Sequence, residues 1–127
     1  MELQIIEHEF SVCKIEDLEQ VNFCEDYVFL LKAPDEITLV CKSEHVPTNN
    51  IASESGWRAL KVAGVLVFGM IGVIAKISKI LSEAKISIFV TSTYNTDYFF
   101  IKEDYFCKAL QVLKQNGYTV PSTKNSI

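Results

Sequence analysis

The sequence lacks a surplus of positive charge. Its 127 residues carry 12 Lys and Arg against 16 Asp and Glu, which gives a formal net charge of −4 at pH 7. Because nucleic acids are bound by basic surfaces, this balance argues against a nucleic-acid partner. No predicted helix carries Lys along one face, so binding to a membrane surface is also disfavoured.

Long apolar runs are missing too. The longest uncharged apolar stretch covers residues 62–75, and Gly64, Gly69 and Gly72 interrupt it. A transmembrane helix needs about 20 apolar residues, so no bilayer span is expected. The start of the chain has no basic segment followed by an apolar one, so we expect no signal peptide. Together these observations predict a cytoplasmic protein.

Spacings typical of metal and redox sites are absent as well. There are four cysteines and two histidines, and no Cys-x-x-Cys motif occurs. We therefore expect buried, reduced thiols in place of disulfides or a zinc site. The sequence also shows no nucleophile–base pair and no phosphate-binding loop, so we expect no catalytic residue, no metal and no cofactor. The cysteines are Cys13, Cys24, Cys41 and Cys107, and the histidines are His8 and His45.

What the chain does have is material for a core, with 49% hydrophobic and 22% charged residues. This composition predicts one folded domain or two very small ones. In the N-terminal half, dense apolar runs predict short strands, and Pro34-Asp35 predicts a hairpin turn between the last two. The acidic residues 16–19 predict at most one helical turn, and the polar residues 43–56 an exposed loop or short capped turn. The strands are expected at residues 3–10, 11–15, 27–31 and 37–41.

The C-terminal half predicts the order strand, helix, strand, strand, helix, strand. This order is satisfied by an α+β, ferredoxin-like βαββαβ unit with two helices on one face of an antiparallel sheet. The N-terminal half repeats part of the order with weaker helices, which predicts two related small sheets; alternatively, the additional strands extend a single sheet. The strands are expected at residues 57–63, 86–91, 98–102 and 118–120, and the helices at residues 69–84 and 104–115.

A candidate ligand site centres on the polar turn at residues 92–98. This turn has more hydrogen-bonding groups than a chain reversal needs, and turns on rigid scaffolds commonly hold small polar ligands. The predicted helix start at residue 69 offers backbone N–H groups that could bind a carboxylate. Asp97 could pair with an ammonium. An amino acid carries both groups, so it is the ligand that this pair of features predicts. The candidate ligand-binding residues are Gly69, Met70, Ile71, Gly72, Val73, Ser92, Thr93, Tyr94, Asn95 and Asp97.

Structural roles could also explain these residues. Gly69 and Gly72 could serve helix packing or a tight turn. Asp97 could cap its own turn, and Tyr94 could belong to a core or an interface. The helix start and Asp97 could also need a second unit or a second chain to meet at one ligand.

Several segments together resemble the ACT domain: Trp57-Arg58-Ala59-Leu60-Lys61-Val62, Gly64, Gly72-Val73-Ile74-Ala75, Ile86-Ser87-Ile88-Phe89 and the turn at residues 92–98. The resemblance is closest to small bacterial tandem-ACT proteins related to CASTOR-type arginine sensors and aspartate kinase regulatory domains. It implies a degenerate ACT-like unit over residues 1–56 and an ACT domain over 57–120, and the polar residues 121–127 predict a disordered tail. It also implies a non-catalytic regulatory protein that holds an amino acid between its ACT units. A homodimer through ACT sheets or helices is implied as well.

One segment departs from that family. Relatives often carry Gly-Pro-Leu-Asp-Phe before the first helix, whereas this chain has Gly64-Val65-Leu66-Val67-Phe68 and no acid. Since residues 62–75 carry no charge, a ligand side chain there would meet apolar walls. We therefore expect a small or apolar amino acid in place of arginine. The alternative function is a protein-interaction or oligomerisation module whose ligand site is degenerate and empty.

Overall fold

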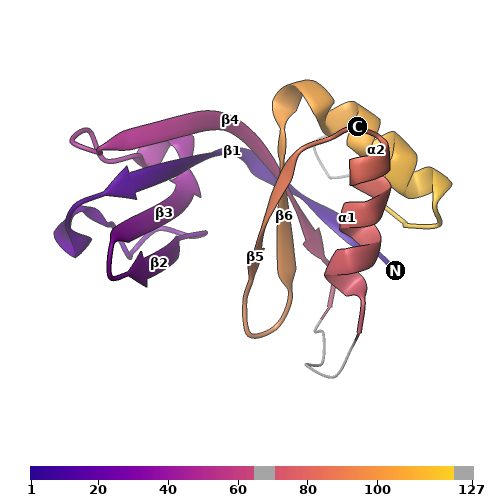
Figure 1. The fold of residues 1–127 in the computed structure, drawn as a ribbon, viewed down its shortest axis with the longest axis horizontal. Coiled ribbons are helices and arrows are strands. Elements are labelled where there is room, and N and C mark those ends of the chain that lie inside the picture. Colours follow the sequence, from indigo (N-terminus) through magenta and orange to yellow (C-terminus); the bar gives the residue numbers. More distant parts are fainter. Residues whose placement is uncertain (65–70, 122–127) are drawn as a thin grey trace. The chain divides into compact units, whose positions relative to one another are not determined.

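The computed structural model of the chain describes residues 1–64 and 71–121 (Figure 1). The predicted site residues Gly69 and Met70, and residues 122–127 of the predicted tail, lie outside the described residues. The chain divides into two compact units, unit 1 with Met1–Glu7 and Arg58–Ile127, and unit 2 with His8–Trp57. The assignment of residues 1–56 and 57–120 to two ACT-like units stays a prediction.

Two long strands contribute to both units. They are β1 (Leu3–Ile15) and β4 (Ala52–Val62), and the division falls within each of them. The sequence predicted a polar loop through residue 56, but β4 begins at Ala52. The first residues of β4 have exposed side chains, so backbone hydrogen bonding and not burial holds them in the strand. The loop prediction rested on the lack of apolar periodicity, and that criterion does not detect a strand segment whose side chains are exposed.

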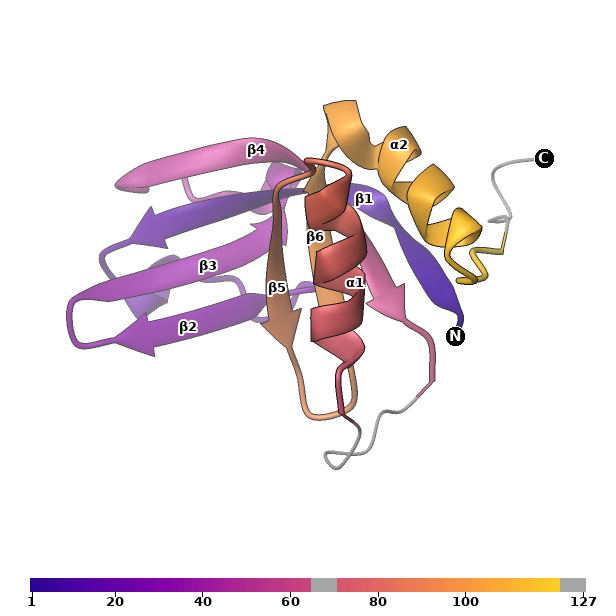
Figure 2. The same ribbon diagram turned by 45° about the vertical axis from the view of Figure 1, so that its right-hand side comes forward.

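Unit 1 combines a sheet with two α-helices. Its strands are hydrogen-bonded in the order β1-β4-β6-β5, and β5 and β6 form an antiparallel hairpin. Both helices lie on the same side of these strands in Figures 1 and 2. This arrangement confirms the predicted α+β class with an antiparallel sheet and two helices. The remaining elements of the unit are α1 (Val73–Glu83), β5 (Ile88–Ser92), β6 (Asp97–Lys102) and α2 (Glu103–Gln115).

The core of unit 1 lies between the helices and the sheet. Each helix has apolar residues three or four positions apart, so one face of each is buried. Glu103 and Asp104 open α2 where the helix dipole favours acids, and Gly117, at φ 92°, follows its end. The fully buried helix residues are Ile77, Leu81, Phe106, Ala109 and Leu113, and they pack with Leu3, Leu60, Val62, Phe99 and Ile101 of the strands.

Two boundaries in unit 1 differ from the prediction. The helix predicted from residue 69 begins at Val73, after Gly72 in a left-handed conformation. The predicted last strand at residues 118–120 is reduced to one parallel bridge between Glu2 and Thr119. Pro121 follows directly and has no N–H to donate, which explains why the ladder does not continue.

Unit 2 is built from strands. β2 (Phe29–Ala33) and β3 (Glu36–Lys42) form the predicted hairpin around Pro34-Asp35, and the hydrogen-bonded order is β2-β3-β1-β4. Residues 8–57 contain no α-helix, only the 3-10 turns η1 (Leu18–Gln20) and η2 (Ser43–His45). A tandem arrangement of two ferredoxin-like units therefore stays a prediction.

Candidate functional site

The beginning of α1, four residues later than the sequence predicted, is one half of the candidate site. Gly72 occupies the N-cap at φ 82°, and no side chain among the described residues caps it. The first N–H groups of any α-helix have no acceptor within the helix, so they are available to an anion. Ile71 is 95% exposed and Val73 half-buried, so this end of the helix is open on one side.

The turn between β5 and β6 uses much of its polarity internally. The Ser92 hydroxyl donates a 2.6 Å hydrogen bond to Asp97 Oδ1, and Asp97 is only 8% exposed. Thr93 N donates to Thr96 O at 2.8 Å, and the Thr96 hydroxyl donates to the Val62 carbonyl at 2.8 Å. The turn is therefore fixed to the end of β4, and the structural role foreseen for Asp97 is part of what it does.

The two remaining residues of the predicted turn site face solvent. Tyr94 is 81% exposed, and Asn95 is exposed as well. They stand at the tip of the hairpin, beyond the last ladder pair, Ser92 and Asp97. Their side chains are therefore accessible to a ligand or a partner.

Both halves of the predicted site lie at the same end of unit 1. Figures 1 and 2 both place the β5–β6 turn and the start of α1 at that end. The lengths explain this, because the 11 residues of α1 rise about 16 Å and the 5 residues of β5 return about the same distance. A second chain is therefore not required to bring the turn to the level of the helix start.

A cavity of about 240 Å³ opens beside the start of α1. Three of the predicted site residues line it, but none of the predicted residues of the β5–β6 turn does. Sequence reasoning missed the other five described lining residues, because they meet through tertiary packing and share no motif. Burial raises the pKa of Tyr118 in the cavity wall above its ordinary value. The lining residues are Met1, Ile71, Gly72, Val73, Lys76, Asn116, Gly117 and Tyr118.

Comparison with known families identifies the fold of unit 1. A family model described as the ACT domain matches residues 52–115, half of the chain. The chain belongs to the ACT domain family. ACT domains are regulatory domains that bind small molecules and are typically non-catalytic. No curated protein matches the chain.

Several solved structures have a fold similar to that of this chain. An Agrobacterium tumefaciens protein is 22% identical, with a TM-score of 0.83 over 94% of this chain and 91% of its own. A Vibrio cholerae protein of unknown function, described as a possible transport protein, is 19% identical, with a TM-score of 0.73 over 87% of this chain and 85% of its own. The ligand-free regulatory subunit of Thermus thermophilus aspartate kinase is 10% identical, with a TM-score of 0.60 over 89% and 95%. At these identities the likeness concerns the fold alone.

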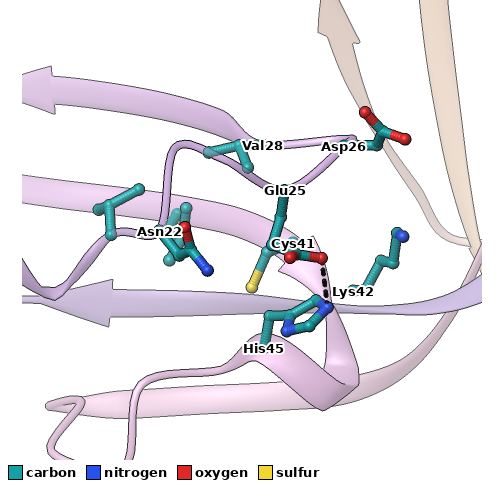
Figure 3. Close-up of a pocket in the computed structure, with 9 residues that line it drawn as sticks. Asn22, Glu25, Asp26, Val28, Cys41, Lys42 and His45 are labelled. Carbon is teal, nitrogen blue, oxygen red and sulfur yellow. Dashed lines mark ion pairs between the residues drawn. The ribbon is translucent and has the colours of Figure 1, made fainter.

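Unit 2, outside most of the ACT match, holds a separate small pocket (Figure 3). His45 Nε2 and Glu25 Oε1 form an ion pair at 2.6 Å beside Cys41. The cavity is only about 10 Å³, room for roughly one water molecule, so it cannot hold an amino acid. Burial, with the neighbouring Cys13 as a smaller cause, raises the pKa of Cys41 to about 12.

The chemistry of this second pocket does not favour catalysis. A nucleophilic cysteine needs a lowered pKa, whereas Cys41 keeps its proton at neutral pH. No group of three or more His, Cys, Asp or Glu side chains within residues 1–64 and 71–121 is placed to hold a metal ion. Nor is any helix in that part of the chain long and apolar enough to cross a bilayer.

Proposed function

We propose that this ACT protein is a regulatory amino-acid sensor without catalysis of its own, and that its ligand binds in the cavity beside α1. The observation that carries the proposal is the cavity of about 240 Å³ at the open N-terminus of a helix. The first N–H groups of α1 and the Lys76 ammonium would hold the ligand carboxylate. The family match supports a regulatory role, because ACT domains are regulatory small-molecule binding domains.

The size and lining of the cavity support a small ligand. At about 240 Å³ it is smaller than pockets for drug-sized molecules, which measure about 300–1,000 Å³. Ile71 and Val73 offer apolar contacts, and Lys76 offers the one cationic side chain among the residues that line it. We therefore propose that the ligand is an amino acid with a small or apolar side chain. Arginine, the ligand of the CASTOR-type sensors, is not the expected ligand. Asp97 does not line this cavity, so its pairing with the ligand ammonium is a separate part of the proposal, tested by its own variant.

The proposal also includes the assembly and the cellular location that were expected from the sequence. A second copy of the chain would pair with unit 1 and close the site, in a tandem or dimeric arrangement. A cytoplasmic location fits the four free cysteines, of which Cys13 and Cys41 are buried as expected, whereas Cys24 and Cys107 are exposed, contrary to the expectation of buried thiols. Exposed thiols persist where the environment is reducing.

A thermal-shift screen with the twenty common amino acids at millimolar concentration tests the proposal. Ligands that bind only the folded state raise its unfolding temperature, so one small or apolar amino acid should do so. Lys76→Ala should remove the shift, whereas Lys79→Ala, on an exposed position of the same helix outside the cavity lining, should keep it. Arginine as the strongest stabiliser would overturn the side-chain assignment, and equal loss with both variants would overturn the site.

A protein-interaction module is the second candidate function. Ile71, just before α1, is 95% exposed, and Tyr94, in the β5–β6 turn, is 81% exposed. The start of α1 and this turn lie at the same end of unit 1 (Figures 1 and 2). Large exposed side chains of this kind are common in docking surfaces. If no amino acid stabilises the protein, this function is favoured over the sensor.

A further inference from the structure

Tyr118 carries a buried hydroxyl that the proposed carboxylate contacts do not use. The residue is only 7% exposed and lines the cavity beside α1. Within residues 1–64 and 71–121, no side chain or backbone group forms a hydrogen bond with this hydroxyl. Buried polar groups in proteins nearly always have a hydrogen-bond partner, so the Tyr118 hydroxyl points to a ligand in the cavity.

The backbone on both sides of Tyr118 holds the side chain in place. Gly117, at φ 92°, follows the end of α2, and Tyr118 N donates to the Leu113 carbonyl at 3.1 Å. On the other side, Thr119 N donates to the Met1 carbonyl at 3.0 Å. The Tyr118 ring packs in the core cluster of unit 1. The hydroxyl is therefore positioned before a ligand arrives, which reduces the entropic cost of binding.

The cavity lies between two helix ends of opposite polarity. The N-terminus of α1 contributes Gly72 and Val73 to its lining, and the C-terminus of α2 contributes Asn116 and Gly117. A helix N-terminus carries partial positive charge and a C-terminus partial negative charge, so α1 favours a carboxylate and α2 favours an ammonium. Lys76 is the one charged side chain among the described lining residues, none of which is acidic. A ligand ammonium in this cavity therefore has neutral oxygen atoms as its partners.

We propose that Tyr118 selects amino acids over carboxylic acids that lack the amino group, because its hydroxyl oxygen accepts a hydrogen bond from the ligand ammonium. This inference rests on the proposed amino-acid site beside α1. A phenol oxygen can accept a hydrogen bond while it keeps its own proton, and burial raises the pKa of Tyr118. An ammonium has three N–H donors, so this contact leaves donors for the carbonyl oxygens at the end of α2 and for the separately tested Asp97.

The two charged groups of an amino acid give the lining residues different effects. Lys76 and the first N–H groups of α1 would bind the carboxylate, which an amino acid shares with its deamino acid. Tyr118 would bind the ammonium, which only the amino acid carries. Loss of the Tyr118 hydroxyl should therefore weaken binding of the amino acid alone, whereas loss of the Lys76 ammonium should weaken binding of both.

Calorimetric titration at pH 7 with matched ligand pairs tests the proposal. The pairs are L-alanine and propionate, L-valine and isovalerate, and L-leucine and isocaproate, and the members of each pair differ only in the amino group. The wild type should bind the amino acid of its preferred pair more tightly than the acid. Tyr118→Phe keeps the ring and should weaken the amino acid about 10- to 100-fold, because a hydrogen bond to a charged group is lost. Its affinity for the acid should be unchanged.

Tyr105→Phe is the matched control variant. Tyr105 is 49% exposed on α2 and lies outside the described cavity lining, so both affinities should stay at the wild-type level. Lys76→Ala should weaken both members of the preferred pair. Without ligand, Tyr118→Phe should unfold at the same temperature as the wild type or higher, because the hydroxyl has no partner within residues 1–64 and 71–121.

Each contrary result overturns a stated part of the argument. Equal weakening of the amino acid and the acid in Tyr118→Phe would assign Tyr118 to packing, and an unchanged affinity for the amino acid would show that water alone satisfies the hydroxyl. A lower unfolding temperature of ligand-free Tyr118→Phe would show that the hydroxyl stabilises the fold itself. These results would overturn this inference and leave the proposed function standing. A wild type that binds no member of any pair would overturn both.

Discussion

Ser92 and Asp97 are joined across the last pair of the β5–β6 ladder by a 2.6 Å hydrogen bond from the Ser92 hydroxyl to Asp97 Oδ1. A carboxylate has about four acceptor positions, so this bond leaves capacity for a ligand. Asp97 is 8% exposed, however, and does not line the cavity beside α1. Its structural and binding roles are separable by substitution.

Asp97→Asn should keep the fold and test the binding role. The amide oxygen of Asn can still accept from Ser92, so we expect a loss of about 1 kcal/mol in the free energy of unfolding. If Asp97 binds the ligand ammonium, the amino-acid-induced rise in unfolding temperature should vanish. Ser92→Ala is the matched control, since it removes the internal bond and retains the charge. Severe unfolding of Asp97→Asn would assign Asp97 a structural role alone.

Gly72→Ala should destabilise unit 1 through backbone strain. A Cβ at Gly72 would meet nothing within 4 Å, so no clash is expected, but its φ of 82° lies in the left-handed region. This conformation costs a residue with a side chain about 1–2 kcal/mol. Gly72→Asn should cost less, because Asn tolerates the left-handed region. Urea denaturation of the three proteins measures the order, and equal losses for Ala and Asn would contradict the strain argument.

The sequence predicted unit 1 well because its signals are periodic. The apolar spacing predicted both helices of unit 1, although α1 begins four residues later than predicted. In unit 2, the local turn signal Pro34-Asp35 correctly predicted the β2–β3 hairpin. The early part of β4 was missed because Ala52–Gly56 has no buried side chain and so lacks the apolar alternation that indicates a strand.

The candidate site was predicted only in part. The sequence placed the helix start at residue 69, whereas α1 begins at Val73, because the apolar pattern does not reveal that Gly72 adopts a left-handed conformation. Lys76, Asn116 and Tyr118 come together through tertiary packing, and no spacing in the sequence indicates that they share a cavity. The internal bond of Asp97 was weighed as an alternative, and only the structure shows its partner, Ser92.

Alkaline pH should destabilise the protein through Cys41. Its pKa is raised from 9.0 to about 12 in the folded state, so the unfolded state loses this proton first as pH rises. Stability is therefore complete below about pH 9 and declines between about pH 9 and pH 12. The loss from this thiol amounts to roughly 2–4 kcal/mol.

Cys41→Ala isolates that contribution. Cys13, Tyr98 and Tyr118 also have raised pKa values and act in the same direction, so the comparison with wild type is essential. Urea midpoints measured near pH 8 and near pH 11 should differ less in Cys41→Ala than in the wild type. Parallel pH dependence in both proteins would show that Cys41 is not the buried titrating group.

Strand β5 ends the hydrogen-bonded order of unit 1 and carries no charge. Residues 86–96 contain no Asp, Glu, Lys, Arg or Pro. Natural edge strands usually carry Lys or Pro, which prevent pairing with another chain. The strand β2, at the edge of unit 2, follows that rule with Lys32. The contrast supports pairing of β5 with β5 of a second copy.

Thr91→Lys should therefore convert the proposed dimer into a monomer. A lysine at this half-buried strand position would place like charges near one another in an antiparallel β5–β5 pair, which is unfavourable. Thr91→Val retains the size and the strand preference of the residue and should remain dimeric. Sedimentation velocity at micromolar concentration measures the masses, and circular dichroism checks that the fold is unchanged. A dimeric Thr91→Lys would place the interface elsewhere, whereas a monomeric wild type would remove dimerisation from the proposed function, because the uncharged edge would then stay unpaired in solution.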